Sequence, residues 1–244
     1  MRLADHFFYS PHERDGVYHF DADEARHAVK ALRLRVGDGL RWVDGAGGRF
    51  AGRLRAVTPR GMTAVADTRE VESPGPELTL GVGALHDASR LEWLVEKAVE
   101  LGVTQVAVLR TERVGRSRHR IARLLSRALA AMKQSGRSRL PTVGEEDFEP
   151  FVARAETPVR LVAHCDPTRD RSPLALVPNG LLQRGCTALI GPEGDFTLGE
   201  IERAAGAGFR EISLGSARLR TETAAIAVLA AACGARTLPP DVAR

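Results

Sequence analysis

Two glycine-containing segments in the second half of the chain have the composition of ligand-binding loops. IGPEGDF (190–196) and LGSARLRTETA (214–224) each lie at the end of a predicted β-strand. Ligands of open α/β sheets lie outside the carboxyl ends of the strands, so two such exits about two dozen residues apart predict one shared pocket. Glycines there would let backbone N–H and C=O groups approach a flat ring such as adenine. The alternative for GPEGD is a tight turn without a ligand.

Other common ligand signatures are missing from the sequence. Neither GxGxxG nor GxxxxGK[ST] occurs, which disfavours a Rossmann dinucleotide site and a P-loop. The three cysteines are widely separated and odd in number, so they predict neither a disulfide framework nor a CxxC zinc site, and they fit a reducing compartment. The seven histidines have no paired spacing on one helix face, so we expect no metal. No Ser/His/Asp or Cys/His nucleophilic site is evident.

Basic residues are concentrated in two segments, although the formal net charge is only +4. Residues 30–60 hold eight Lys or Arg against two Asp, and residues 110–139 hold ten Lys or Arg against one Glu. Such local density favours a polyanionic partner. The alternative is an arginine-rich coding bias with solvated side chains.

The chain has no predicted targeting or membrane segment. MRLADHFFYSPHERD lacks a signal pattern, and the longest apolar run, Ala224–Cys233, is about half of the ~20 residues that span a bilayer. We therefore expect a cytoplasmic globular protein that is not embedded in a membrane.

The elements that must position the glycine loops fall into two groups. Residues 1–72 contain β-like runs divided by glycine turns (LRWVDG, GRFAGRLRAV, MTAVADTREV) and one helix, DADEARHAVKALRL, with its N-cap at Asp21. This pattern predicts a small β-barrel domain. The Pro- and Gly-rich segment VESPGPE (71–77) places a domain boundary near residues 73–76.

Residues 76–244 alternate between predicted strands and helices, which predicts a parallel sheet flanked by helices. The strands are LTLGVGAL, VTQVAVL, VRLVAH, TALIG and EISLG. The helices are SRLEWLVEKAVELG, which ends at Gly102; RIARLLSRALAAMKQS, whose apolar face is Ile121, Leu124, Leu125, Leu129 and Met132; a helix opened by a capping box of Thr197 and Glu200; and TETAAIAVLAAACGA.

Several segments resemble one known family in their order and spacing. IGPEG with an acidic residue at Glu200, and LGSARLRTETAA, closely resemble the RsmE-type 16S ribosomal RNA (uracil-N3)-methyltransferases of the SPOUT superfamily. Further similar segments are EKAVELGV (96–103), the pair Glu112-Arg113, KQSGRSRLP (133–141), HAVKALRLRVGD (27–38) and the pair Asp44-Gly45. The resemblance spans nearly the whole chain, and LRTETA is its most specific motif.

This resemblance implies a PUA-like β-barrel, which would dock RNA, followed by a SPOUT methyltransferase domain with a deep trefoil knot near its C-terminus. It implies a homodimer that uses S-adenosylmethionine, with the small ribosomal subunit as partner and N3 of uridine 1498 in 16S rRNA as target. The cofactor pocket implied by the family motifs comprises His164, Ile190, Gly191, Gly194, Leu214, Gly215, Leu219, Thr223 and Ala224.

The chain departs from the family pattern at two places. Asp195 occupies the position of the last glycine in GPEGG, the sequence that is common in the family. Arg218 occupies the position before LRTETA, where the family commonly has an isoleucine-like residue. Aspartate tolerates the same turn geometry as glycine, but its charge is new to this loop.

Methylation of uracil N3 makes two chemical demands. Transfer from a sulfonium is an in-line displacement that needs positioning, and the N3 proton must leave before or during attack. Glu222 is a candidate base, and Arg220 or Arg137 could stabilise the uridine anion or hold a phosphate. The alternative for Glu222 is a cap of the final helix. The residues expected at RNA are Arg33, Arg35, Arg113, Arg116, Arg137 and Arg139.

Two other functions remain open at this point. Another SPOUT enzyme could methylate a ribose 2′-hydroxyl or a transfer RNA base, although LRTETA argues against it. A non-catalytic RNA-binding or ribosome-assembly factor would bind no cofactor, and the glycine loops argue against that. The apolar residues Ile226, Val228, Leu229 and Ala232 of the final helix predict either core or a dimer interface.

Overall fold

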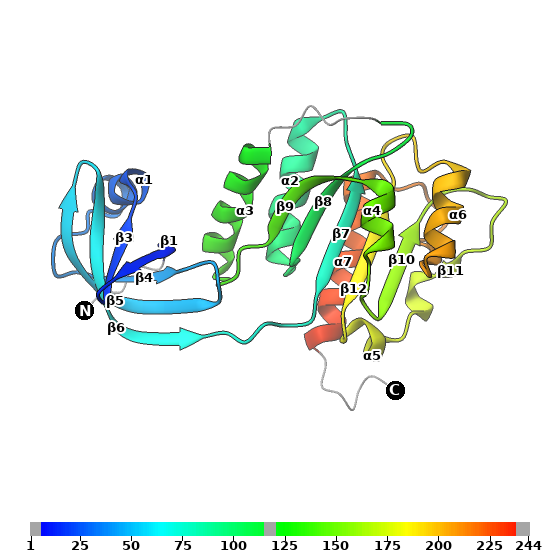
Figure 1. Ribbon diagram of the computed structural model, residues 1–244. Helices are drawn as coiled ribbons and strands as arrows, with labels where there is room; N and C mark the ends of the chain where they lie inside the picture. The colour runs from blue at the N-terminus through cyan, green and yellow to red at the C-terminus, as the bar shows by residue number, and fades with distance from the viewer. Residues whose placement is uncertain (1–5, 115–120, 238–244) are drawn as a thin grey trace. The chain divides into compact units, whose positions relative to one another are not determined.

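A computed structural model describes residues 6–114 and 121–237 and divides the chain into two compact units (Figure 1). The first unit comprises Met1–Gly75 and Leu129–Leu140, and the second comprises Pro76–Ala128 and Pro141–Arg244. One helix, α3 (Ile121–Ser135), therefore begins in the second unit and ends in the first. The sequence pattern contains no signal for this return of the chain.

The first unit is built on a six-stranded sheet in the order β1-β4-β5-β6-β3-β2. Its strands are β1 (Phe7–Tyr9), β2 (His12–Arg14), β3 (Val17–Phe20), β4 (Gly39–Val43), β5 (Gly48–Thr58) and β6 (Gly61–Val71). Helix α1 (Ala22–Arg26) runs on into a π-helical turn, His27–Ala31. The Asp21 carboxylate accepts hydrogen bonds from the backbone N–H groups of Asp23 and Glu24, which confirms the predicted N-cap.

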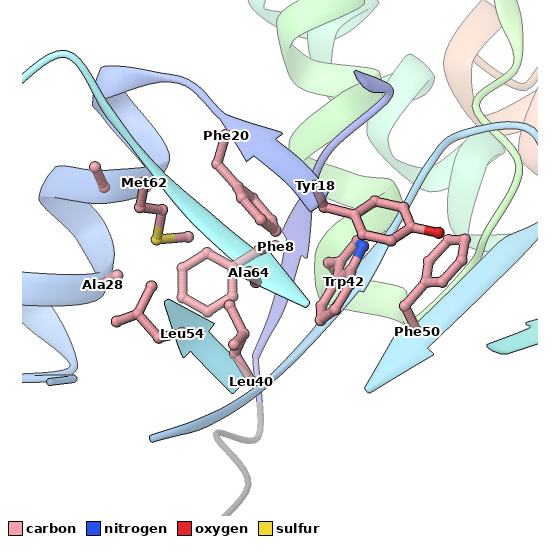
Figure 2. Packing of buried hydrophobic residues seen from close by; sticks show 11 residues of the cluster. Phe8, Tyr18, Phe20, Ala28, Leu40, Trp42, Phe50, Leu54, Met62 and Ala64 are labelled. Carbon is pink, nitrogen blue, oxygen red and sulfur yellow. The ribbon is translucent and has the colours of Figure 1, made fainter. Parts of the chain in front are cut away.

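A cluster of buried hydrophobic residues rich in aromatic rings forms the core of this unit, as Figure 2 shows. Trp42 stacks on Phe50 with 5.5 Å between ring centroids, and Phe8 meets Phe20 edge to face at 6.3 Å. Both geometries are favoured for aromatic pairs. Five of the chain's twelve Phe, Trp and Tyr residues belong to this cluster, so aromatic packing is a main feature of the small domain.

The second unit is a seven-stranded, wholly parallel sheet in the order β11-β13-β10-β12-β7-β8-β9, as the alternating pattern predicts. The strands are β7 (Leu78–Gly83), β8 (Gln105–Arg110), β9 (Thr142–Asp147), β10 (Val159–Ala163), β11 (Ser172–Pro173), β12 (Cys186–Ile190) and β13 (Arg210–Ser213). The helices are α2 (Ala88–Glu100), α3, α4 (Phe148–Ala153), α5 (Asn179–Leu182), α6 (Leu198–Gly206) and α7 (Thr221–Thr237), with a 3-10 turn at Leu174–Leu176.

Helices cover both faces of this sheet (Figure 1). α4 and α6 pack on one face over a cluster that includes Phe151, Val162 and Leu189. α7 contacts α2 and strands β7 and β12, and its Val228, Leu229 and Ala232 are buried there while Ile226 is half-buried. The apolar face of α7 therefore belongs to the core of the unit.

The local helix signals are confirmed, with one exception. Thr197 and Glu200 form the capping box of α6, and Gly102 follows α2 in the left-handed conformation. The predicted apolar face of α3 is wrong at Leu125, which is exposed, whereas Leu124, Ala128 and Met132 are buried. Leu125 lies about 100° around the helix from Leu124, so the buried stripe is narrower than the run of apolar residues.

The described residues form neither a membrane-spanning helix nor a cluster of metal ligands. In residues 6–114 and 121–237, no helix is long and apolar enough to cross a membrane. The same residues contain no group of three or more His, Cys, Asp or Glu side chains that could hold a metal ion.

Candidate active site

A cavity of about 340 Å³ lies at the carboxyl ends of β10, β12 and β13, which are adjacent in the sheet. It is lined by Arg90, Ala163, His164, Cys165, Arg171, Ile190, Gly191, Pro192, Glu193, Asp195, Ile212, Ser213, Leu214, Gly215, Ala217, Arg218, Leu219, Arg220, Thr221 and Ala224. Such a position and volume are usual for a small-molecule site in a parallel sheet. The two glycine segments do meet at one pocket.

The structure brings most of the proposed cofactor residues together. His164, Ile190, Gly191, Leu214, Gly215, Leu219 and Ala224 line the cavity. Gly194 and Thr223 do not. The Gly194 carbonyl accepts a hydrogen bond from Arg113, and Thr223 lines a neighbouring cavity.

Gly191 allows the loop after β12 to fold tightly against itself. A Cβ atom at this position would lie 2.8 Å from Asp195 Oδ1 and 2.9 Å from the backbone N of Phe196. The Gly191 carbonyl accepts a hydrogen bond of 3.0 Å from Thr221 Oγ1, which joins this loop to the first turn of α7. Glycine at 191 is therefore required by the space available.

Asp195 connects the two loops that follow β10 and β12. Its φ of 64° lies in the left-handed region, which aspartate tolerates better than most residues. Asp195 Oδ2 accepts a hydrogen bond of 2.7 Å from the backbone N of Cys165, and Oδ1 accepts one of 2.8 Å from that of Phe196. The side chain that departs from the family pattern thus fixes the wall of the cavity.

We expect Asp195→Gly to weaken cofactor binding several-fold with little loss of stability. Glycine would relieve a left-handed backbone that costs an L-residue about 1 kcal/mol, and this gain would offset part of the two lost hydrogen bonds. Calorimetric titration with S-adenosylmethionine and thermal unfolding would measure the two effects. Asp195→Asn is the matched control, because it keeps an acceptor for Cys165 N and should bind better than the glycine variant. Equal affinity of Asp195→Gly and the wild type would contradict this role.

His164 is held at the end of β10 by a network of charged residues. Its Nδ1 accepts a hydrogen bond of 3.3 Å from the backbone N of Asp166, so the proton lies on Nε2, which donates to Glu211 Oε2 at 2.9 Å. Arg169 donates two hydrogen bonds of 2.6 Å to Glu211 and, together with His164, holds the pKa of Glu211 below its usual value. The network keeps the His164 ring fixed beside the cavity.

A second cavity, of about 420 Å³, adjoins the first one. It is lined by Ser89, Arg90, Trp93, Arg220, Glu222 and Thr223, and it shares Arg90 and Arg220 with the first cavity. Glu222 is 8% exposed; its Oε1 lies 3.9 Å from Arg90 Nε, and its Oε2 is buried without a hydrogen-bond partner. A buried carboxylate oxygen without a hydrogen-bond partner is uncommon in proteins and requires an explanation.

The remaining predicted residues lie elsewhere. Arg33, Arg35, Arg137 and Arg139 belong to the first unit, and Arg116 lies outside the described residues. Arg33 and Arg35 are exposed, whereas Arg139 is half-buried and donates a hydrogen bond of 2.5 Å to the carbonyl of Glu72. Part of the basic segment 110–139 is also engaged in ion pairs within the second unit, because Arg123 and Arg127 both contact Glu92.

Comparisons with known proteins identify two domains in this chain. Residues 72–233 match the family model of an RNA methyltransferase domain, and residues 20–66 match that of an RNA methyltransferase PUA domain. The fold and the site thus define an RNA methyltransferase with an N-terminal PUA domain.

Individual relatives narrow this class further. The chain is 33% identical over 215 residues to the ribosomal RNA small subunit methyltransferase E of Synechocystis sp., covering 85% of this chain and 69% of that protein. The crystal structure of a probable rRNA-methyltransferase from Porphyromonas gingivalis has a TM-score of 0.82 at 32% identity, covering 92% and 95% of the two chains. The chain belongs to the ribosomal RNA small subunit methyltransferase E family.

A relative with its cofactor is also known in three dimensions. The ribosomal RNA small subunit methyltransferase E from Neisseria gonorrhoeae, bound to S-adenosyl methionine, has a TM-score of 0.79 at 26% identity, covering 93% of this chain and 95% of that one.

Proposed function

We propose that this protein transfers a methyl group from S-adenosylmethionine to N3 of uracil in 16S rRNA, at the family's target uridine 1498 of the small subunit. The observation that carries the proposal is the pair of adjoining cavities, one walled by glycine loops and the other lined by Glu222, whose Oε2 has no hydrogen-bond partner. Such a substrate would place the protein in the cytoplasm.

The first cavity suits S-adenosylmethionine. Its apolar lining, which includes Ile190, Leu214 and Leu219, fits an adenine ring, and the tight fold at Gly191 shapes the wall of the cavity at the strand end. When bound, the cofactor supplies an electrophilic methyl group. The chain's own residues hold it and keep water away from the reacting atoms.

The second cavity supplies the groups that uracil N3 requires. Glu222 lines this cavity, and its carboxylate, whose Oε2 has no hydrogen-bond partner, would accept the N3 proton. Arg220 and Arg90 line the same cavity, and their positive charge would stabilise the uridine anion that remains. Arg90 is also held by Glu193 Oε1 at 3.3 Å, which limits its movement.

Digestion of the labelled product distinguishes this chemistry from methylation of the ribose. RNA methylated with labelled S-adenosylmethionine is hydrolysed in alkali, which cleaves next to a free 2′-hydroxyl. The proposal predicts label in mononucleotides. Label in alkali-resistant dinucleotides would show a 2′-O-methyltransferase and would overturn it.

We expect the PUA domain to bind RNA phosphates through exposed arginines, including Arg33 and Arg35. RNA affinity should then fall steeply with salt, and each lost phosphate contact should reduce the slope of log K against log salt by about 0.7. Titrations at several salt concentrations with Arg33→Ala/Arg35→Ala should show this smaller slope. Arg154→Ala is the control, because Glu146 already engages that guanidinium at 2.6 Å. A flat salt response of the wild type would refute a phosphate-binding surface.

The proposal includes a homodimer and a trefoil knot at the cofactor loops, as the family resemblance implies. Sedimentation at micromolar concentration should show the mass of two chains. A monomer under those conditions would contradict the dimer.

A further inference from the structure

The second cavity has an aromatic wall that the proposed chemistry does not use. Trp93 lies on α2 and lines this cavity with 45% of its surface exposed. An indole ring offers a large face on which a nucleobase can stack. Most large aromatic side chains of the described chain are buried, so an exposed tryptophan beside a candidate catalytic carboxylate needs an explanation.

The polar residues that line the cavity can pair with the groups of the uracil edge. Uracil presents a carbonyl oxygen, an N3–H and a second carbonyl oxygen along one edge. The cavity is lined by the Glu222 carboxylate together with two guanidinium donors, Arg90 and Arg220. Cytosine has an acceptor at N3 and a donor at N4, so it would place a lone pair toward the carboxylate. The cavity therefore favours uracil over cytosine.

We infer that this cavity is the receptor for the target base, in which a uracil turned out of the RNA stacks on Trp93 while its N3 edge meets Glu222. The inference rests on the proposed function and adds the acceptor site to it. Because Arg90 and Arg220 line both cavities, the base would lie beside the cofactor. Unstacking the base from RNA costs energy, which stacking on Trp93 would partly return.

The tryptophan content of the chain allows a direct test. There are two tryptophans; Trp42 is fully buried in the first unit, so acrylamide in solution quenches mainly Trp93. Quenching is measured with S-adenosylhomocysteine present, so that no methyl transfer occurs, and with an RNA that contains the target uridine. We expect the quenching constant to fall at least twofold. The same RNA with cytidine at the target should protect much less, and Trp93→Phe should remove the quenchable signal.

Two results would overturn the receptor. In the first, acrylamide quenches Trp93 equally with and without RNA, although fluorescence anisotropy shows that the RNA is bound. In the second, Trp93 is already shielded from acrylamide without RNA, and the shielding increases with protein concentration. The second result would show that another copy of the chain covers Trp93.

Kinetics of two variants provide an independent test. Trp93→Ala should raise the KM for RNA about tenfold, because stacking on an aromatic ring is lost, and it should leave the affinity for S-adenosylmethionine unchanged. Trp93→Phe keeps an aromatic face and should recover most of the loss. A wild-type chain that transfers no methyl group would refute the proposed function. Transfer by the wild type with an unchanged KM in Trp93→Ala would refute the Trp93 receptor alone.

Discussion

Glu222→Gln is expected to slow methyl transfer by about 100-fold or more while the affinity for S-adenosylmethionine stays nearly unchanged. Removal of a positioned general base typically costs at least this factor. Glutamine keeps the shape of the side chain in its buried position but cannot take the N3 proton. Single-turnover rates with saturating RNA, combined with calorimetric titration of the cofactor, separate the chemical step from binding.

The control for this exchange is Glu96→Gln, the same substitution at a glutamate of α2 that lines neither cavity. It should transfer methyl groups at the wild-type rate. If Glu222→Gln also retains the wild-type rate, Glu222 has no part in the chemistry and serves only in the first turn of α7.

Gly191→Ala is expected to lower cofactor affinity by about tenfold or more. A Cβ at this position would lie within 3 Å of two atoms of the same loop, one of them the backbone N of Phe196. Relief of such an overlap requires a backbone shift that costs roughly 1–3 kcal/mol, and about 1.4 kcal/mol corresponds to a tenfold change in Kd. The shift would move the wall of the first cavity, and calorimetric titration would measure the loss.

Gly194→Ala is the matched control from the same loop. The nearest atom to a Cβ at 194 is Arg113 Cδ at 3.6 Å, an ordinary contact, and Gly194 does not line the cavity. This variant should bind the cofactor like the wild type. Equal losses in the two variants would mean that general loop stiffness, rather than the space at Gly191, governs binding.

The sequence predicts the site well where the signal is local. Both glycine loops follow segments that form strands of the sheet, and the rule that ligands lie at carboxyl ends of parallel strands is enough to bring Gly191 and Gly215 to one cavity. The capping box at Thr197 and the N-cap at Asp21 are likewise encoded within four residues. The trefoil knot is implied only by family resemblance, since periodicity carries no information on chain crossing.

Contacts that depend on the order of the strands in the sheet cannot be predicted from the sequence. His164 meets Glu211 because β13 lies beside β10 in the sheet, although 47 residues separate the two in the chain. Arg90 reaches Glu193 from a helix 103 residues earlier. The hydrogen bond from the backbone N of Cys165 to Asp195 likewise forms because β10 and β12 are neighbours in the sheet. From the sequence, Trp93 is predicted only to be one residue of an amphipathic helix. The structure shows that it lines the same cavity as Glu222.

The most direct test of the proposed reaction uses small ribosomal subunits from cells that lack this protein. The subunits are incubated with the purified chain and labelled S-adenosylmethionine, and their RNA is digested to nucleosides for mass spectrometry. We predict label in 3-methyluridine, at a single position of 16S rRNA. Label in any other nucleoside, or no transfer by a folded protein that binds RNA, would contradict the proposed function.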